Sequence, residues 1–193
     1  MPTIKIIDAT VEPLTLAEAK AHLRETQTET HNDLLISGLI TVARQAAEDR
    51  LQRTLLTTTW LRTLDRFPAC GGHVELYMPR VIEVTQVKYV APDGANPTLD
   101  PAAYELEPTA EPGLLLPAHG TSWPATRVRP GAVQIQYTAG YGATADKIPK
   151  PIVQWIKLAL TDLYENRGRS AERPALPQDF ADGLLDTYKI WSV

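Results

Sequence analysis

The side chains best able to bind a metal or attack a substrate are scattered along this sequence. Metal sites and cysteine nucleophiles need ligands or partners at defined spacings. The four histidines and the single cysteine show no such spacing. The cysteine also lies in Ala69-Cys70-Gly71-Gly72, without a helix start that would activate its thiol. We therefore interpret His22, His31, His73 and His119 as loop or solvent-exposed positions, and Cys70 as a residue without a nucleophilic role.

One pair of carboxylates has a spacing that could support acid–base chemistry. Glu105 and Glu107 are two residues apart, which would place both on one face of a strand, as in a glycosidase pair. Nothing else in the sequence supports that chemistry, and charges on the exposed face of a strand are the favoured interpretation. A small hydrolase that uses a carboxylate or His73 is kept as an alternative.

Glycines and arginines give no clear binding motif. Gly140-Tyr141-Gly142 lacks both the third glycine of a dinucleotide fingerprint and the Gly-Lys-Ser/Thr of a phosphate loop. Arg62 with Arg66, and Arg127 with Arg129, lie among acidic and apolar residues, which favours solvated charge over phosphate contacts. We expect no catalytic residue, no cofactor and no metal.

The bulk composition predicts a soluble protein that does not bind nucleic acid tightly. Hydrophobic residues make up 44% of the 193 positions, and the net charge is −4, unlike a basic nucleic-acid binder. The single cysteine fits a reducing cytosol, and the first residues lack the layout of a signal peptide. No stretch is apolar enough for a transmembrane helix, so we expect an intracellular protein.

Helical periodicity is found on both sides of a central region that has a strand-like pattern. Thr15 and Glu18 match a capping box, which predicts a helix over Thr15–Arg24. A second helix is predicted over Asn32–Arg50, with a wide apolar stripe, and a third over Ile152–Arg167. Between them, alternating apolar residues and turn signals over Leu55–Tyr137 predict an antiparallel β module.

The predicted fold class is therefore α+β, with a β module inserted into a helical body. Residues 1–54 and 146–168 are assigned to the body, 55–145 to the module, and 169–193 to a linker and C-terminal segment. That segment holds large apolar side chains that need burial, and it could dock on its own helices or on a neighbouring protein. Its candidate docking residues are Phe180, Leu184, Leu185, Tyr188 and Trp191.

The order and spacing of these elements resemble the phage head–tail connector family, the gp6-like adaptors, and in particular the longer phiE125 gp8-like branch. The resemblance covers about Leu14 to Arg167. It is carried by five stretches: LTLAEAKAHLR; DLLISGLITVARQAAEDRL with TTTWLRTLDRFP; VELYMPRVIEVTQVKYVAPDG; SWPATRVRPGAVQIQYTAGYG; and IPKPIVQWIKLALTDLYENR. One departure is Leu51-Gln52-Arg53, where many relatives carry a glycine.

The resemblance implies a structural, non-enzymatic adaptor in the neck of a virion or phage-like particle, assembled in the host cytoplasm. It implies a ring of twelve subunits below the portal protein, next to a stopper or tail-terminator protein, with DNA passing through the lumen and no membrane contact. A ring needs two different patches on each subunit. Candidate interface residues are Leu39, Val42, Ala46 and Trp155, and the C-terminal segment is the candidate portal contact. A stopper, a tail-completion protein or an assembly factor is the nearest alternative.

Overall fold

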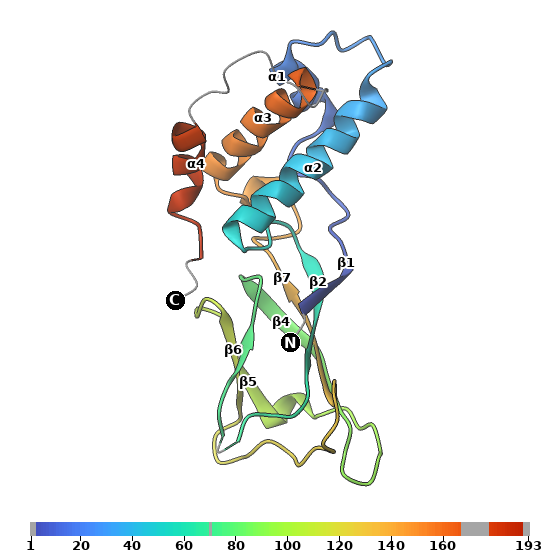
Figure 1. The fold of residues 1–193 in the computed structure, drawn as a ribbon, viewed down its shortest axis with the longest axis vertical. Helices are drawn as coiled ribbons and strands as arrows, with labels where there is room; N and C mark the ends of the chain where they lie inside the picture. Colours follow the sequence, from blue (N-terminus) through green and yellow to red (C-terminus); the bar gives the residue numbers. More distant parts are fainter. Residues whose placement is uncertain (1–2, 70, 167–177, 191–193) are drawn as a thin grey trace. The chain divides into compact units, whose positions relative to one another are not determined.

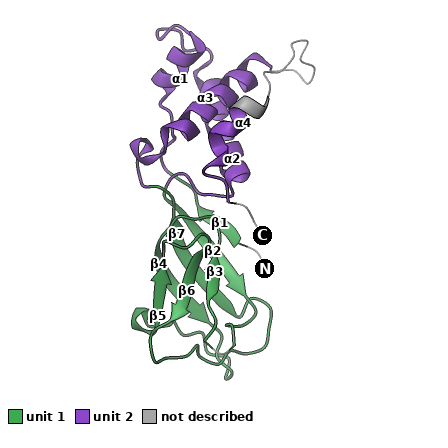
Figure 2. Ribbon diagram, turned by 90° about the vertical axis from the view of Figure 1, so that its left-hand side faces the viewer, with its two compact units in different colours: residues 1–9, 57–141 green, residues 10–56, 142–193 purple. Residues whose placement is uncertain are grey.

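The chain folds into two compact units, one helical and one built from strands (Figure 2). The computed structural model describes residues 3–69, 71–166 and 178–190, the first three residues of the last range in their backbone alone. Residues 10–56 and 142–193 form the helical unit, and residues 1–9 and 57–141 form the β unit. This arrangement confirms the predicted α+β fold class.

The helical unit contains three predicted helices and a fourth in the C-terminal segment (Figure 1). Their bounds differ from the predicted ones by one or two residues, as expected for helix ends. They are α1 (Leu16–Leu23), α2 (Asp33–Leu51), α3 (Lys150–Glu165) and α4 (Gln178–Asp186). A short 3₁₀ turn, Ala145–Lys147, precedes α3.

Local chemistry sets the helix ends. The Thr15 hydroxyl accepts from the Glu18 backbone N–H at 3.2 Å, and the Thr15 N–H donates to the Glu18 carboxylate at 2.9 Å. The predicted capping box is therefore confirmed, and the Thr15 N–H and hydroxyl, which both donate to the Glu18 carboxylate, hold the pKa of Glu18 below its ordinary value. At the end of α2, Gln52 adopts a left-handed conformation with φ of 53°. A non-glycine residue thus makes the turn for which the resemblance expects glycine.

The apolar stripe of α2 divides into two faces. Ile36, Ile40, Ala43 and Ala47 are buried, and together with apolar residues of α3 they form the core of the helical unit. A second row of apolar residues, each one position before a residue of the buried row, lies outside this core. In this second row Val42 is exposed, while Leu39 and Ala46 are half-buried. The helix therefore carries a second apolar face that the unit itself does not cover.

Two antiparallel sheets make the β unit. One sheet has the order β1-β2-β7-β4, and the other has the order β3-β6-β5. The first contains β1 (Thr3–Ile7), β2 (Thr58–Leu64), β7 (Val133–Ala139) and β4 (Val81–Tyr89). The second contains β3 (Val74–Leu76), β6 (Gly113–Pro117) and β5 (Tyr104–Glu107), which a 3₁₀ turn (Pro101–Ala103) precedes.

Alternating side chains of β2, β4 and β7 build the core between the sheets. Trp60 lies opposite Tyr137 and Arg62 opposite Ile135 in the β2–β7 register, and all four are buried. Phe67 stacks on Trp123 at 4.7 Å between ring centroids and closes one end of this core. On β7 the alternating residues Val133, Ile135 and Tyr137 are all buried, as the period of two in a strand requires.

The strand β1 is absent from the sequence-based prediction. Residues 3–7 pair with β2, placing Ile4 opposite Leu61 and Lys5 opposite Trp60, so the N-terminal segment forms an edge of the first sheet. β2 begins at Thr58, and the preceding Leu55 and Leu56, placed at the start of the predicted β module, are buried and belong to the helical unit.

Candidate assembly surfaces

The residues first considered for chemistry do not converge. His22, His31, His73 and His119 lie on separate segments, and no three metal-ligating side chains cluster within the described residues. Glu105 and Glu107 are exposed on β5, and the hydroxyl and N–H of Thr109 bind Glu107 and hold its pKa below the ordinary value. Cys70 lies outside the described residues.

The arginines of the β unit have different environments. Arg62 is 9% exposed, and its guanidinium lies 4.4 Å from the centroid of the Tyr77 ring. Arg66, Arg127 and Arg129 are exposed on the loops that join the strands. The sequence-based interpretation as solvated charge thus agrees with the exposure of these three, whereas Arg62 is an internal side chain.

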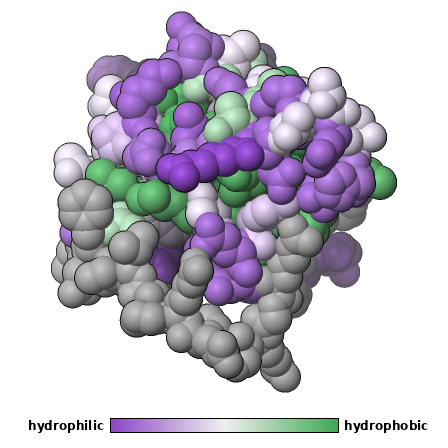
Figure 3. Space-filling model, turned by 90° about the horizontal axis from the view of Figure 1, so that it is seen from above, coloured by the Kyte–Doolittle hydropathy of each residue, from purple (hydrophilic) through white to green (hydrophobic). Residues whose placement is uncertain are grey.

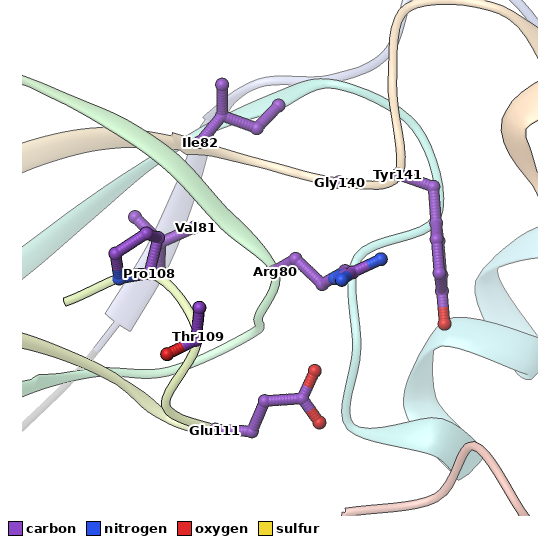
Figure 4. Close-up of a pocket in the computed structure, with 8 residues that line it drawn as sticks. All are labelled: Arg80, Val81, Ile82, Pro108, Thr109, Glu111, Gly140 and Tyr141. Atoms are coloured by element: carbon purple, nitrogen blue, oxygen red, sulfur yellow. The ribbon is translucent and has the colours of Figure 1, made fainter.

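A cavity of about 350 Å³ lies at one end of the β unit (Figure 4). It is lined by Arg80, Val81 and Ile82 at the start of β4, by Pro108, Thr109 and Glu111 after β5, and by Gly140 and Tyr141 after β7. The Arg80 guanidinium lies 5.8 Å from the centroid of the Tyr141 ring. Among the described residues that line this cavity there is no histidine, lysine or cysteine.

The outer face of α2 is the more distinctive surface. Leu34 is 90% exposed and Val42 is 47% exposed. Gly38 lies one turn after Leu34 and one turn before Val42, and a Cβ added there would meet nothing within 4 Å. The face therefore presents apolar side chains around a notch. Figure 3 views the helical end from above, and hydrophilic residues cover most of what is visible there, with apolar residues between them.

Buried ion pairs hold α2 in place on the side away from its outer apolar face. Arg44 is 1% exposed and binds the carboxylates of Glu12 at 2.8 Å and Glu48 at 3.0 Å. The second Glu48 oxygen accepts from the Leu55 N–H at 3.0 Å. This network ties the segments before and after α2 to the helix, so the outer apolar face is held on a rigid element.

The C-terminal segment docks on the helices of its own chain. Leu185 is 4% exposed, and Leu184 and Tyr188 are half-buried. Asp182 accepts from Arg50 and from the Trp155 indole, and the Arg50 contact lowers the pKa of Asp182. The Tyr188 carbonyl accepts from the Arg53 guanidinium at 3.0 Å. The side chain of Phe180 and the whole of Trp191 lie outside the described residues.

The four candidate interface residues therefore separate into two environments. Val42 is exposed, and Leu39 and Ala46 are half-buried beside it on the outer face of α2. Trp155, in contrast, is 6% exposed between Arg50 and Asp182, within the helical unit. Sequence reasoning missed the exposed isoleucines of β1, although the alternation in Thr3-Ile4-Lys5-Ile6-Ile7 is a signal that could have located the strand.

Comparison with solved structures finds the same arrangement of elements elsewhere. The chain shares its fold with particle neck chains. A chain from the neck of an empty GTA particle, computed with C6 symmetry, matches with a TM-score of 0.83 at 24% identity. A chain from the virion of a native gene transfer agent (GTA) particle matches at 0.81 and 24%, and one from the neck of a native GTA particle, computed with C12 symmetry, at 0.76 and 23%.

Each match covers 100% of this chain and 97% of the other, so the likeness extends over both units. No protein-family model matches this sequence, and no curated protein matches it. In the described part of the chain, every helix is too short or too polar to span a lipid bilayer.

Proposed function

We propose that this chain is a head–tail adaptor, a structural subunit of the neck of a tailed phage or phage-like particle. Many copies form a ring below the portal, with DNA passing through the lumen. The observation that carries the proposal is the uncovered apolar face of α2, in a fold shared with chains of GTA particle necks. Exposed apolar patches of this kind mark protein–protein contacts. The function is non-enzymatic.

In this proposal the helical unit is the connector body and the β unit is the inserted module. The outer α2 face, with Leu39, Val42 and Ala46, provides one side of the subunit contact. Trp155 acts indirectly, because it supports α2 and α4 from within the unit. The ring lumen is net acidic, in keeping with the net charge of −4, so phosphates are repelled and DNA slides.

The C-terminal segment is the proposed portal contact. Leu185 anchors it to its own chain, and Leu184 and Tyr188 are half-buried. In this proposal Leu184 and Tyr188 contact the portal, and Phe180 and Trp191 are further contact residues. Leu184→Glu should then weaken portal binding without unfolding the helical unit. Leu185→Ala, in contrast, should destabilise the unit itself, because it creates a cavity. Equal portal affinity for wild type and Leu184→Glu would contradict this assignment.

The decisive experiment is electron microscopy of the purified protein mixed with its cognate portal. An adaptor should bind portal directly and appear as a ring beneath it. A stopper or tail-completion protein should bind only after another neck protein has been added. Val42→Glu, which charges the outer α2 face, should prevent ring formation. Gln154→Glu, the same change at an exposed glutamine of α3, serves as the matched control.

A further inference from the structure

Exposed apolar side chains gather on two separate elements of this chain. Ten large apolar side chains are exposed within the described residues, and six of them lie on β1 or α2. On β1 they are 42% to 57% exposed, and on α2 they are 38% to 90% exposed. The two groups are Ile4, Ile6 and Ile7 on β1, and Leu34, Leu35 and Val42 on α2.

The β1 group lies on the edge strand of the first sheet. β1 is the terminal strand of its sheet, and the β1–β2 register places Lys5, not the isoleucines, opposite the core residue Trp60. Natural edge strands are commonly guarded by a proline or a free lysine. Here the Lys5 ammonium binds Asp8 at 3.1 Å and lies 5.6 Å from the centroid of the Trp60 ring. Ile4 and Ile6 are therefore exposed on an edge strand whose lysine is engaged, and the strand has a register irregularity between Lys5 and Ile7.

The α2 group surrounds a notch. Glycine within a helix lowers its stability, and at Gly38 an added Cβ would meet no atom within 4 Å, so packing does not require a glycine there. A helix position without a side chain allows a protruding side chain of another element to enter between its neighbours. The gap between Leu34 and Val42 suits a branched apolar group such as isoleucine.

We infer that the isoleucines of β1 in one copy of this chain pack into the α2 notch of the next copy. The inference rests on the proposed function and supplies the second half of its subunit contact. A closed ring repeats one heterologous contact, which requires two different patches on each subunit. β1 and α2 are the two elements on which exposed large apolar side chains gather. The necks that contain chains of this fold were computed with C6 and C12 symmetry, so the partner is a second copy.

The test uses two variants that each block one patch. Ile4→Glu/Ile6→Glu places charge on β1, and Gly38→Leu fills the notch while improving the helix propensity of α2. Assembly is followed by native mass spectrometry over a concentration series, alone and on the cognate portal. Each variant should associate at least about tenfold more weakly than wild type, a loss of about 1.4 kcal/mol per contact. Gly38→Leu should keep or raise the thermal midpoint, which separates assembly from folding.

A mixture of the two variants gives the sharper result. Each variant retains one intact patch, so an equimolar mixture should form one-to-one dimers that cannot grow, under the conditions in which wild type assembles. If β1 instead pairs with β1, Gly38→Leu alone will dimerise, and the inference is wrong. If both variants still form rings, the inference is wrong and the adaptor proposal stands. If wild type stays monomeric with and without portal, both are wrong.

Discussion

Replacing Lys20 with methionine tests how the segment between α1 and α2 is held. The Lys20 side chain is 3% exposed, and its ammonium donates to the Gln27 carbonyl at 3.3 Å, to the Glu29 carbonyl and to the Asp33 carboxylate at 2.8 Å. A hydrogen bond to a charged group contributes about 1.5–3 kcal/mol, and removing one partner of a buried ion pair costs about 3–5 kcal/mol. Methionine keeps the apolar stem of the side chain but loses all three bonds.

Because the Asp33 side chain is 28% exposed, water will compensate part of this loss. We therefore expect Lys20→Met to lower the free energy of unfolding of the helical unit by about 2–4 kcal/mol. Urea denaturation followed by circular dichroism at a helical wavelength measures this change. Lys88→Met, at an exposed lysine of β4, is the matched control and should stay within about 0.5 kcal/mol of wild type.

The same variant should also change local protection. With the ammonium gone, amide hydrogen exchange over residues 25–32 should accelerate, while α3 keeps its protection relative to global unfolding. The Asn32 amide still donates to the Tyr164 hydroxyl at 2.9 Å, so the start of α2 should remain attached. If Lys20→Met and Lys88→Met denature at the same urea concentration, the buried ammonium contributes no net stability and the reasoning is refuted.

Three further predictions concern helix ends and docking. Glu18→Gln should destabilise α1 at neutral pH. Because folding lowers the pKa of Glu18, the stability that its carboxylate contributes is present above its ordinary pKa of 4.5 and is lost as the pH falls below that value. Acid denaturation curves of the variant and of wild type should therefore converge. Leu185→Ala should lower the free energy of unfolding by about 2–5 kcal/mol and speed proteolysis of α4. Leu184→Ala, at a half-buried position, should lower it by less than half as much. Equal losses of unfolding free energy for the two variants would contradict the docking of α4. Gln52→Val should destabilise the protein by about 1–2 kcal/mol in a thermal melt, because a β-branched residue is strained at positive φ. A larger loss of stability for Gln52→Gly than for Gln52→Val would show that the left-handed turn is unimportant.

The sequence predicted most elements because their signals are local. The capping box at Thr15 and Glu18, the apolar period of α3 and the alternation in β7 each lie within one segment. The alternation in residues 3–7 could have located β1 as a strand, but its pairing could not be predicted because its partner β2 is more than fifty residues away. The docking of α4 was left open for a similar reason, since the contacts of Asp182 with Arg50 and Trp155 depend on tertiary packing.

The candidate surface could be predicted only in part. Periodicity identified both rows of apolar residues on α2 but could not distinguish the buried row from the outer one. That choice depends on where α3 and α4 pack, and neither position follows from the α2 sequence. Trp155 was grouped with the outer row for the same reason. Its burial beside Arg50 makes it a supporting residue, whereas Val42 remains exposed.

The distribution of charge on α2 indicates why this helix suits an assembled particle better than a solitary chain. Arg44 and Glu48 are buried on its inner side, while Leu34 and Val42 are exposed on its outer side. This distribution is unfavourable for a lone subunit, because burying charge lowers its stability and exposing apolar surface lowers its solubility. The arrangement is consistent if the outer side becomes an interior on assembly. The buried ion pairs then fix the orientation of a helix whose binding face must match its neighbour.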